Sequence, residues 1–244
     1  MYRAPLVSGE IYHIYNRGND KRVIFSDDHE YSRFDSLVRH YLIYDYPYSH
    51  VQSRLQQSTR DRAVISREEI LAQLEASRFQ EPLVEVICYT QMPNHFHLVL
   101  RQVANGGISN FMHRLGTGYT NYFNLRHERS GTLFEGRFKY VRVESEIQLI
   151  YLSGYIHINA LAAGLVGLDT LVTYPWSSLA EYLGKSKEGI CKKEVVMSNF
   201  GDEAKYLEFI LASARGSRES GVRQVGEVAI DDDFGWFGEL RLGG

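Results

Sequence analysis

The stretch VEVICYTQMPNHFHLVLR, residues Val84–Arg101, decides the fold of this chain. Its two apolar runs, Val84–Tyr89 and Phe96–Arg101, are rich in β-branched, aromatic and aliphatic residues, and each has the length of a strand. The break between them, Gln91–Asn94, contains Pro93, which fixes φ and lacks a backbone donor. The stretch is therefore expected to form a β-hairpin.

The second strand of this hairpin opens with His95, Phe96 and His97. Side chains alternate between the two faces of a strand, so the two histidines share one face and Phe96 points to the other. Two imidazoles on one rigid strand can hold one metal ion. The pair can equally be two polar residues at the mouth of a strand, and the hairpin alone leaves both interpretations open.

Composition sets limits on the class of protein. With 244 residues, 44% hydrophobic and 23% charged, the chain is long and apolar enough for a globular core. A net charge of −3 gives no global nucleic-acid signature, so any DNA contact must come from a local patch. Cys88 and Cys191 are far apart, which is typical of a reduced, cytoplasmic protein. The sequence contains no apolar run long enough to predict a signal peptide or a membrane span.

Further elements are expected on both sides of the hairpin. Before it, Glu10–Asn16 alternates like a strand, and a helix capped within Ser26–Asp28 runs to about Tyr44. After it come a helix over Asn110–Arg126 capped by Ser109, an extended segment Leu133–Val143 bent at Gly136, and a helix capped by Ser145 that ends near Ala163.

This order of elements predicts an α+β fold. A β-α-β-β-α-β run is the ferredoxin-like arrangement, here with an antiparallel sheet, helices on one face and one extra helix after the last strand. We expect one domain over residues 1–166, interrupted by a peripheral helical or mobile insertion at 47–82. Residues 167–244 form a partly helical C-terminal extension with a loosely ordered tail.

The helix that follows Ser145 carries the best partners for the two histidines. Tyr151, Tyr155 and Asn159 recur every four residues and share one helix face. The amide oxygen of Asn159 is a hard ligand suited to Mg²⁺ or Mn²⁺, and the phenol of Tyr155 can attack a phosphodiester. Most buried tyrosines are simply core aromatics, so Tyr155 taken alone is better explained by packing.

Basic residues gather between the last two helices. They are Arg126, Arg137, Lys139 and Arg142. This cluster is either a solvated basic face or a patch that contacts phosphates.

Several motifs in this order resemble a known family. MPNHFHLVL resembles the HUH motif, two histidines around a bulky hydrophobic residue, of single-tyrosine HUH transposases. IYHIYNRGN, GTLFEGRFKYVRVES, YIHINALAAGLV and YPWSS resemble this family's first strand, the segment before its tyrosine helix, that helix and a C-terminal signature. The greatest similarity is to the REP-associated tyrosine transposases.

The resemblance implies roles for residues at matching positions. His95, His97 and Asn159 would be metal ligands for Mg²⁺ or Mn²⁺, and Tyr155 would be the nucleophile. Such enzymes nick single-stranded or hairpin DNA, form a 5′-phosphotyrosine link and transfer strands. They work as monomers or as homodimers, and no membrane partner is implied.

The chain also departs from the family pattern. Ala160 replaces a familiar proline, and Ala162 replaces an arginine that could contact phosphate, a loss for which Arg137 and Arg142 could compensate. Tyr151 fits the motif less well than Tyr155 as a nucleophile. His157 lies on another side of the helix and is interpreted as a packing or outer-shell group, and no pattern supports a role for His13.

Two other functions compete with the transposase hypothesis. A ferredoxin-like sheet with exposed aromatics can bind single-stranded nucleic acid without any chemistry. A zinc hydrolase built on His95 and His97 needs another strong ligand and a general base, for which the sequence offers no motif.

Overall fold

A four-stranded sheet forms the centre of the computed structural model, which describes residues 5–53, 66–186 and 188–219. Its strands are β1 (Ile11–Arg17), β2 (Val84–Met92), β3 (His95–Gln102) and β4 (Lys139–Arg142). They are ordered β2-β3-β1-β4, and every neighbouring pair is antiparallel. This is the ferredoxin-like strand order, so the predicted fold class is confirmed.

The predicted hairpin is formed by β2 and β3. Only Pro93 and Asn94 lie between the two strands, so the strands are longer than their apolar runs. The carbonyl of Pro93 accepts hydrogen bonds from the backbone of Ile24 and Phe25. The turn is therefore anchored to the segment that leads into the first helix.

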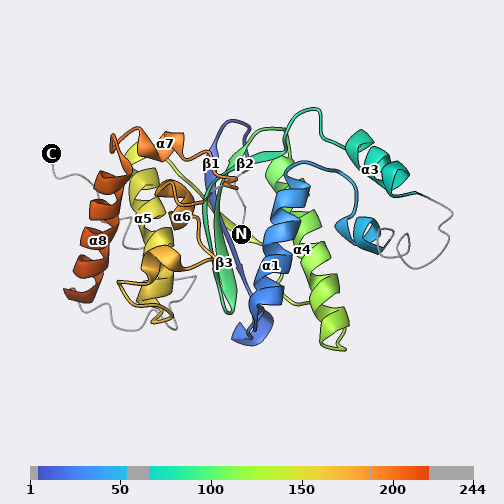
Figure 1. Ribbon diagram of the computed structural model, residues 1–244, viewed down its shortest axis with the longest axis horizontal. Coiled ribbons are helices and arrows are strands. Elements are labelled where there is room, and N and C mark those ends of the chain that lie inside the picture. Colours follow the sequence, from blue (N-terminus) through green and yellow to red (C-terminus); the bar gives the residue numbers. More distant parts are fainter. Residues whose placement is uncertain (1–4, 54–65, 187, 220–244) are drawn as a thin grey trace.

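Helices cover both faces of the sheet (Figure 1). Helices α1 (Asp28–Tyr41) and α4 (Gly107–Arg126) pack on one face, and α5 (Glu146–Ala162) packs on the other. The expectation that helices occupy one face is therefore wrong. The physical reason is that α5 is buried on several sides, so it needs the sheet on one side and further helices on the other.

The C-terminal extension supplies this outer layer. After a 3₁₀ turn at Leu171–Thr173 it contains α6 (Leu179–Tyr182), α7 (Glu194–Met197) and α8 (Glu203–Glu219). The side chains of Tyr206 and Ile210 on α8 are buried in the same apolar cluster as Leu152 and Ile156 of α5. The division into a domain at 1–166 and an extension at 167–244 stays a prediction, and the tail at 220–244 lies outside the described residues.

Two of the predicted helix caps are present in the structure, and a third is not. Asp27 caps α1 and Ser145 caps α5, each by accepting a hydrogen bond from a first-turn backbone N–H. Ser109, by contrast, lies inside α4, and its capping role was predicted wrongly. The helix begins at Gly107 instead, after Gly106 adopts a left-handed φ of 68°.

The last strand is shorter than the extended segment Leu133–Val143. Only Lys139–Arg142 pairs with β1 as a strand, while Phe134 forms an isolated bridge with Gly18. Gly136 lies between them at a φ of 90°, which is the bend expected there.

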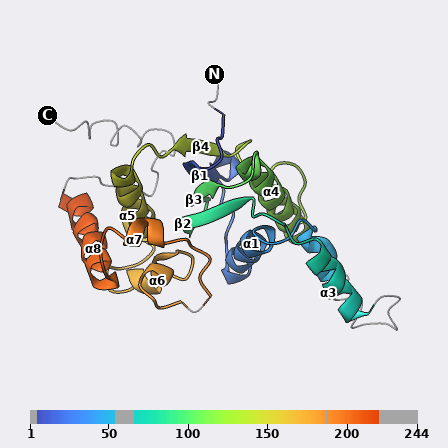
Figure 2. The same cartoon turned by 90° about the horizontal axis from the view of Figure 1, so that it is seen from above.

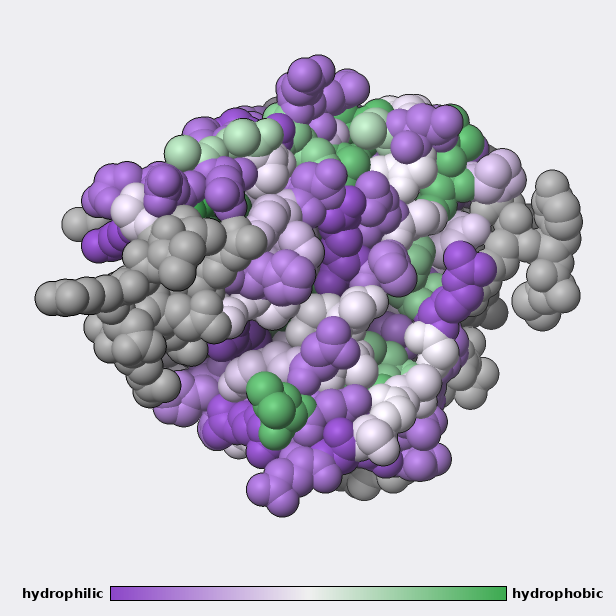
Figure 3. All heavy atoms as spheres, turned by 90° about the vertical axis from the view of Figure 1, so that its right-hand side faces the viewer, coloured by the Kyte–Doolittle hydropathy of each residue, from purple (hydrophilic) through white to green (hydrophobic). Residues whose placement is uncertain are grey.

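The predicted insertion contains α3 (Arg67–Ala76), which begins with a capping box between Ser66 and Glu69. This helix projects from the side of α4 (Figure 2), while residues 54–65 lie outside the described residues. Hydrophilic residues dominate the face of the molecule on this side (Figure 3). In the described ranges no helix combines the length and the apolar character that crossing a membrane requires.

Two glycines of α4 make a matched test of helix packing. A Cβ on Gly107 would lie 2.0 Å from the carbonyl oxygen of Leu83, whereas a Cβ on Gly116 would meet nothing within 4 Å. Gly107→Ala is expected to lower the free energy of unfolding by about 1–3 kcal/mol, because the backbone at Leu83 must move to make room for the added Cβ. Gly116→Ala is expected to raise it by up to about 1 kcal/mol. Urea denaturation of both variants measures the difference, and equal stabilities would contradict the packing.

Candidate active site

The two histidines of the hairpin lie on the face of the sheet that α5 covers. Thr90 of β2 and Tyr15 of β1 lie directly beside His97 on the two neighbouring strands. Residues paired in this way share one face. Phe96 points the other way and is buried in the core beneath α1 and α4, as strand alternation requires.

Helix α5 places its tyrosine and its asparagine over this pair. The ring of Tyr155 meets the ring of His97 edge-on, with centroids 5.9 Å apart. One helical turn further on, Asn159 lies beside His95, and its side chain raises the pKa of that imidazole against the larger opposing effect of burial. The rings of His95 and His97 are themselves 5.0 Å apart and almost perpendicular. All four residues singled out from the sequence therefore meet at one place.

The rival tyrosine is oriented differently. Tyr151 is 39% exposed, and its ring lies 6.0 Å from that of Phe209 on α8. A regular helix turns by about 100° per residue, so Tyr151 and Tyr155 lie some 40° apart around the axis. This offset, together with one turn of axial displacement, directs Tyr151 to α8 and Tyr155 to the histidines.

Burial keeps both histidines neutral. It lowers the pKa of His95 to about 4, with a further decrease from the charge of Arg17 and an opposing effect from the side chain of Asn159. It also lowers the pKa of His97 well below its ordinary value, helped by the neighbouring His13 and His95. Neutral imidazoles have a free lone pair, which is the form that binds a metal.

Unpaired polar atoms mark this site as suited to a ligand. His97 Nε2, Asn159 Nδ2 and Thr90 Oγ1 are buried without a hydrogen-bond partner. Such atoms are costly in a native fold unless an ion or a water meets them. The oxygen and nitrogen of the Asn159 amide exchange places on rotation, so an oxygen ligand is available there. Two imidazoles and one amide oxygen fit a divalent cation such as Mg²⁺ or Mn²⁺.

A zinc site of the usual kind finds less support. Over the ranges that the structure describes, no three His, Cys, Asp or Glu side chains gather closely enough to hold a metal ion. The additional strong ligand that the zinc hydrolase hypothesis needs is therefore missing from these ranges.

The sequence interpretation missed His13. It lies on β1 and is almost fully buried, and its Nε2 is 2.8 Å from Nδ1 of His97. Nothing local in IYHIYN distinguishes this histidine from an ordinary strand residue. Only the pairing of β1 with β3 brings it to the site, since His13 lies opposite Val99 and diagonally from His97.

The four basic residues do not form one patch. Lys139 pairs with Tyr15 across β1 and β4, so its side chain projects on the face of the two histidines. Arg142 pairs with Tyr12 on the other face, and its guanidinium is 2.7 Å from the carboxylate of Glu10.

The other two basic residues lie elsewhere. Arg126, at the end of α4, forms ion pairs with Asp27 and Glu30. Arg137 precedes β4 and lines a shallow hollow of about 260 Å³ together with Phe138 and Tyr140. Of the four, Lys139 is therefore best placed to meet a phosphate at the histidines, and the single basic cluster expected from the sequence is dispersed.

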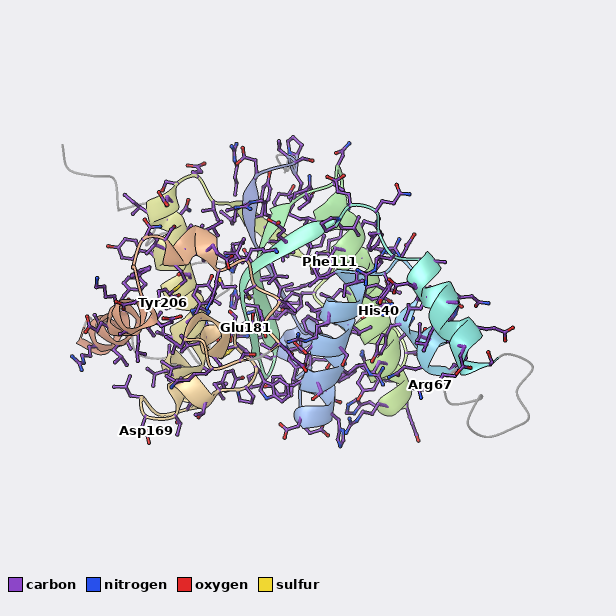
Figure 4. All side chains as sticks on the ribbon, turned by 45° about the horizontal axis from the view of Figure 1, so that its top comes forward. His40, Arg67, Phe111, Asp169, Glu181 and Tyr206 are labelled. Atoms are coloured by element: carbon purple, nitrogen blue, oxygen red, sulfur yellow. The ribbon has the colours of Figure 1, made fainter. Side chains whose placement is uncertain are left out.

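A buried polar network holds α5 against the C-terminal helices. Nδ1 of His157 is 2.7 Å from the hydroxyl of Tyr206, and its Nε2 is 2.8 Å from Oγ of Ser178. The Tyr206 hydroxyl donates to Ser153, so it accepts the Nδ1–H of His157. Tyr206 projects from α8 beside α5 (Figure 4). His157 therefore packs and does not reach the site, and the YPWSS motif supplies Ser178 to this network.

A comparison with known protein families shows what part of this chain is similar to. The family model described as transposase IS200 like matches residues 54–159, a span that includes the hairpin, α4, β4 and α5 as far as Asn159. This part of the chain is similar to IS200-like transposases, and the resemblance inferred from the motifs is confirmed. The match supports a transposase-like, DNA-binding function.

One solved structure that resembles the chain is titled "Structure of the REP associates tyrosine transposase bound to a REP hairpin". It is 14% identical, the alignment covers 78% of this chain and 88% of that chain, and the TM-score is 0.48. No curated protein matches the chain.

The His157 network can be tested by removing the hydroxyl of Tyr206. Tyr206→Phe removes the group that joins His157 to Ser153 and leaves buried polar atoms unpaired, so it is expected to lower the free energy of unfolding by about 1–3 kcal/mol. Tyr151→Phe is the matched control, because its half-exposed side chain predicts a change within about 0.5 kcal/mol. Urea denaturation of both variants measures this free energy. An unchanged free energy of unfolding in Tyr206→Phe would contradict the network.

Proposed function

We propose that this protein is a metal-dependent, single-tyrosine DNA endonuclease and strand transferase. The observation that carries the proposal is the position of α5, whose Tyr155 lies against His97 while its Asn159 lies beside His95. A nucleophile and a ligand set from opposite elements converge there, which is the arrangement that phosphoryl transfer needs.

Tyr155 is the nucleophile in this proposal. Its phenolic oxygen attacks the scissile phosphorus, the bond from phosphorus to the 3′ oxygen breaks, and the released 3′-hydroxyl gains the proton that the phenol loses. The 5′ end of the downstream strand stays on the tyrosine as a phosphodiester. Because one phosphodiester replaces another, the step is reversible, and a 3′-hydroxyl can attack the phosphotyrosine to join strands.

His95, His97 and Asn159 hold the divalent cation, Mg²⁺ or Mn²⁺. The ion would supply charge stabilisation to the phosphate as negative charge builds on its oxygens. The chain's own contribution is to keep both imidazoles neutral by burial and to orient Tyr155 by packing α5 between the sheet and α8.

The substrate in this proposal is single-stranded or hairpin DNA. The IS200-like family match supports DNA as the partner. Lys139 on the histidine face and Arg137 beside the Phe138–Tyr140 hollow are the basic groups best placed to contact phosphates. The hairpin preference, monomer or homodimer assembly and a cytoplasmic location remain predictions from the sequence.

Binding without chemistry is the weaker alternative. It requires an open sheet face on which bases can stack. Helices cover both faces of this sheet (Figure 1), so that platform is not offered.

The nucleophile can be tested with strand-specific labels. An oligonucleotide hairpin labelled at its 3′ end is expected to leave its label covalently on the protein in Mg²⁺, while a 5′ label appears on a free fragment. Tyr155→Phe is expected to abolish the adduct, whereas Tyr151→Phe is expected to retain it. Denaturing gel electrophoresis reads both results. An adduct that persists in Tyr155→Phe would refute the assignment, and no adduct in any variant would favour simple binding.

The metal site can be tested without DNA cleavage. His97→Ala is expected to weaken Mn²⁺ binding by more than the roughly 10- to 100-fold that loss of an outer-shell partner costs. His113→Ala, on the exposed side of α4, is the control and is expected to bind Mn²⁺ like the unmodified protein. Electron paramagnetic resonance of free Mn²⁺ gives the affinity, and equal binding by both variants would exclude His97 as a ligand.

A further inference from the structure

A histidine pair lies beneath the proposed metal site. His13 and His97 are 2% and 3% exposed, and 2.8 Å separates Nε2 of His13 from Nδ1 of His97. The two residues come from β1 and β3, neighbouring strands at the centre of the sheet. The pair is therefore held by the sheet ladder and not by a mobile loop.

The geometry of the two rings makes this a well-aligned hydrogen bond. Their centroids are 5.0 Å apart and their planes differ by 21°. At that centroid distance, a nitrogen–nitrogen separation of 2.8 Å is reached only when both nitrogens lie near the line between the centroids. The rings thus meet edge to edge, and the shared proton lies close to both ring planes, where imidazole donors and lone pairs point.

Two neutral imidazoles can share this proton in two ways. If His13 donates, His97 carries its own proton on Nε2, and that nitrogen has no lone pair for a metal. If His97 donates from Nδ1, its Nε2 keeps a lone pair. Nε2 of His97 is one of several buried side-chain atoms that have no hydrogen-bond partner. The direction of one hydrogen bond therefore decides whether His97 can be a ligand.

We propose that His13 is a positioning residue for the metal site: its Nε2 accepts the Nδ1–H of His97 and holds that imidazole in the tautomer and orientation whose Nε2 binds the cation. This inference rests on the proposed role of His97 as a ligand. Outer-shell acceptors commonly do this for ligating histidines, fixing the ring and raising its basicity. His13 does it here with a neutral ring where a carboxylate or a backbone carbonyl is more usual.

The cost of burying His13 supports a specific role. An imidazole on the apolar face between β1 and α5 must be desolvated, whereas an aliphatic side chain would fill the same place without that penalty. Its neighbour on the same face, Ile11, packs against the α5 core in this ordinary way. The polar ring at position 13 is explained by the hydrogen bond that it forms.

Three substitutions separate positioning from packing. His13→Leu fills the space but offers no acceptor. His13→Gln carries its amide oxygen as many bonds from the backbone as imidazole Nε2, and His13→Asn stops one bond short. We expect His13→Leu and His13→Asn to weaken Mn²⁺ binding by about 10- to 100-fold, and His13→Gln to recover most of the loss. Titration with Mn²⁺ followed by electron paramagnetic resonance gives the affinities, and urea denaturation in EDTA shows that each variant is folded.

Nuclear magnetic resonance reads the tautomer directly in the metal-free protein. Long-range ¹H–¹⁵N spectra of protein labelled at histidine are expected to show His97 protonated on Nδ1, with its resonances assigned by their loss in His97→Ala. Protonation of His97 on Nε2 would overturn the inference, and it would do so even if His13→Leu failed to fold.

The outcomes distinguish this inference from the proposed function. If folded His13→Leu binds Mn²⁺ as tightly as the unmodified protein while His97→Ala does not, His13 has no positioning role and the metal site stands. A loss in His13→Leu that His13→Gln does not recover also overturns the inference. If His97→Ala binds Mn²⁺ normally, the metal site itself fails.

Discussion

The docking of α5 onto the histidine face of the sheet is the constraint on which the rest of the structure depends. It brings Tyr155 against His97 and Asn159 to His95. The helix can sit there only because its other side is covered, and a Cβ on Gly154 would approach within 2.8 Å of Phe209 on α8. The hydrogen bonds of His157 with Tyr206 and Ser178 then lock the three layers together. The C-terminal helices are thus part of what positions the candidate site.

The same layering sets the electrostatics. Because α5 covers the sheet, His97 is buried and both histidines have a lowered pKa, so they offer lone pairs and carry no charge at neutral pH. His95 and Tyr155 are only half-buried. A phosphate would therefore approach from their side, where Lys139 projects on the same sheet face. The charge of Lys139 would attract the DNA strand to this rim, while the chemistry is proposed for the drier interior.

Local patterns predicted most of the fold, and the errors have physical causes. Alternation identified β1 and the hairpin, and helical spacing with Asp27 and Ser145 identified two helices. Ser109 was misjudged as a cap, because the start of α4 is decided by the approach of Gly107 to Leu83. Arg126 and Arg142 were grouped by their nearness in sequence, yet ion pairs with Asp27 and Glu10 hold them apart from the histidines. Acidic partners that are distant in sequence cannot be read from a basic run.

By itself the sequence determined the elements, the sharing of one strand face by His95 and His97, and the spacing of Tyr155 and Asn159 on one helix. These are consequences of backbone periodicity, which acts over a few residues. Only the tertiary structure decided that this helix lies over that strand, that helices cover both sheet faces, and that His13 meets His97. Those relations arise from packing and strand pairing between segments that are distant in sequence, and no local pattern encodes them. The two histidines, for example, are 84 residues apart.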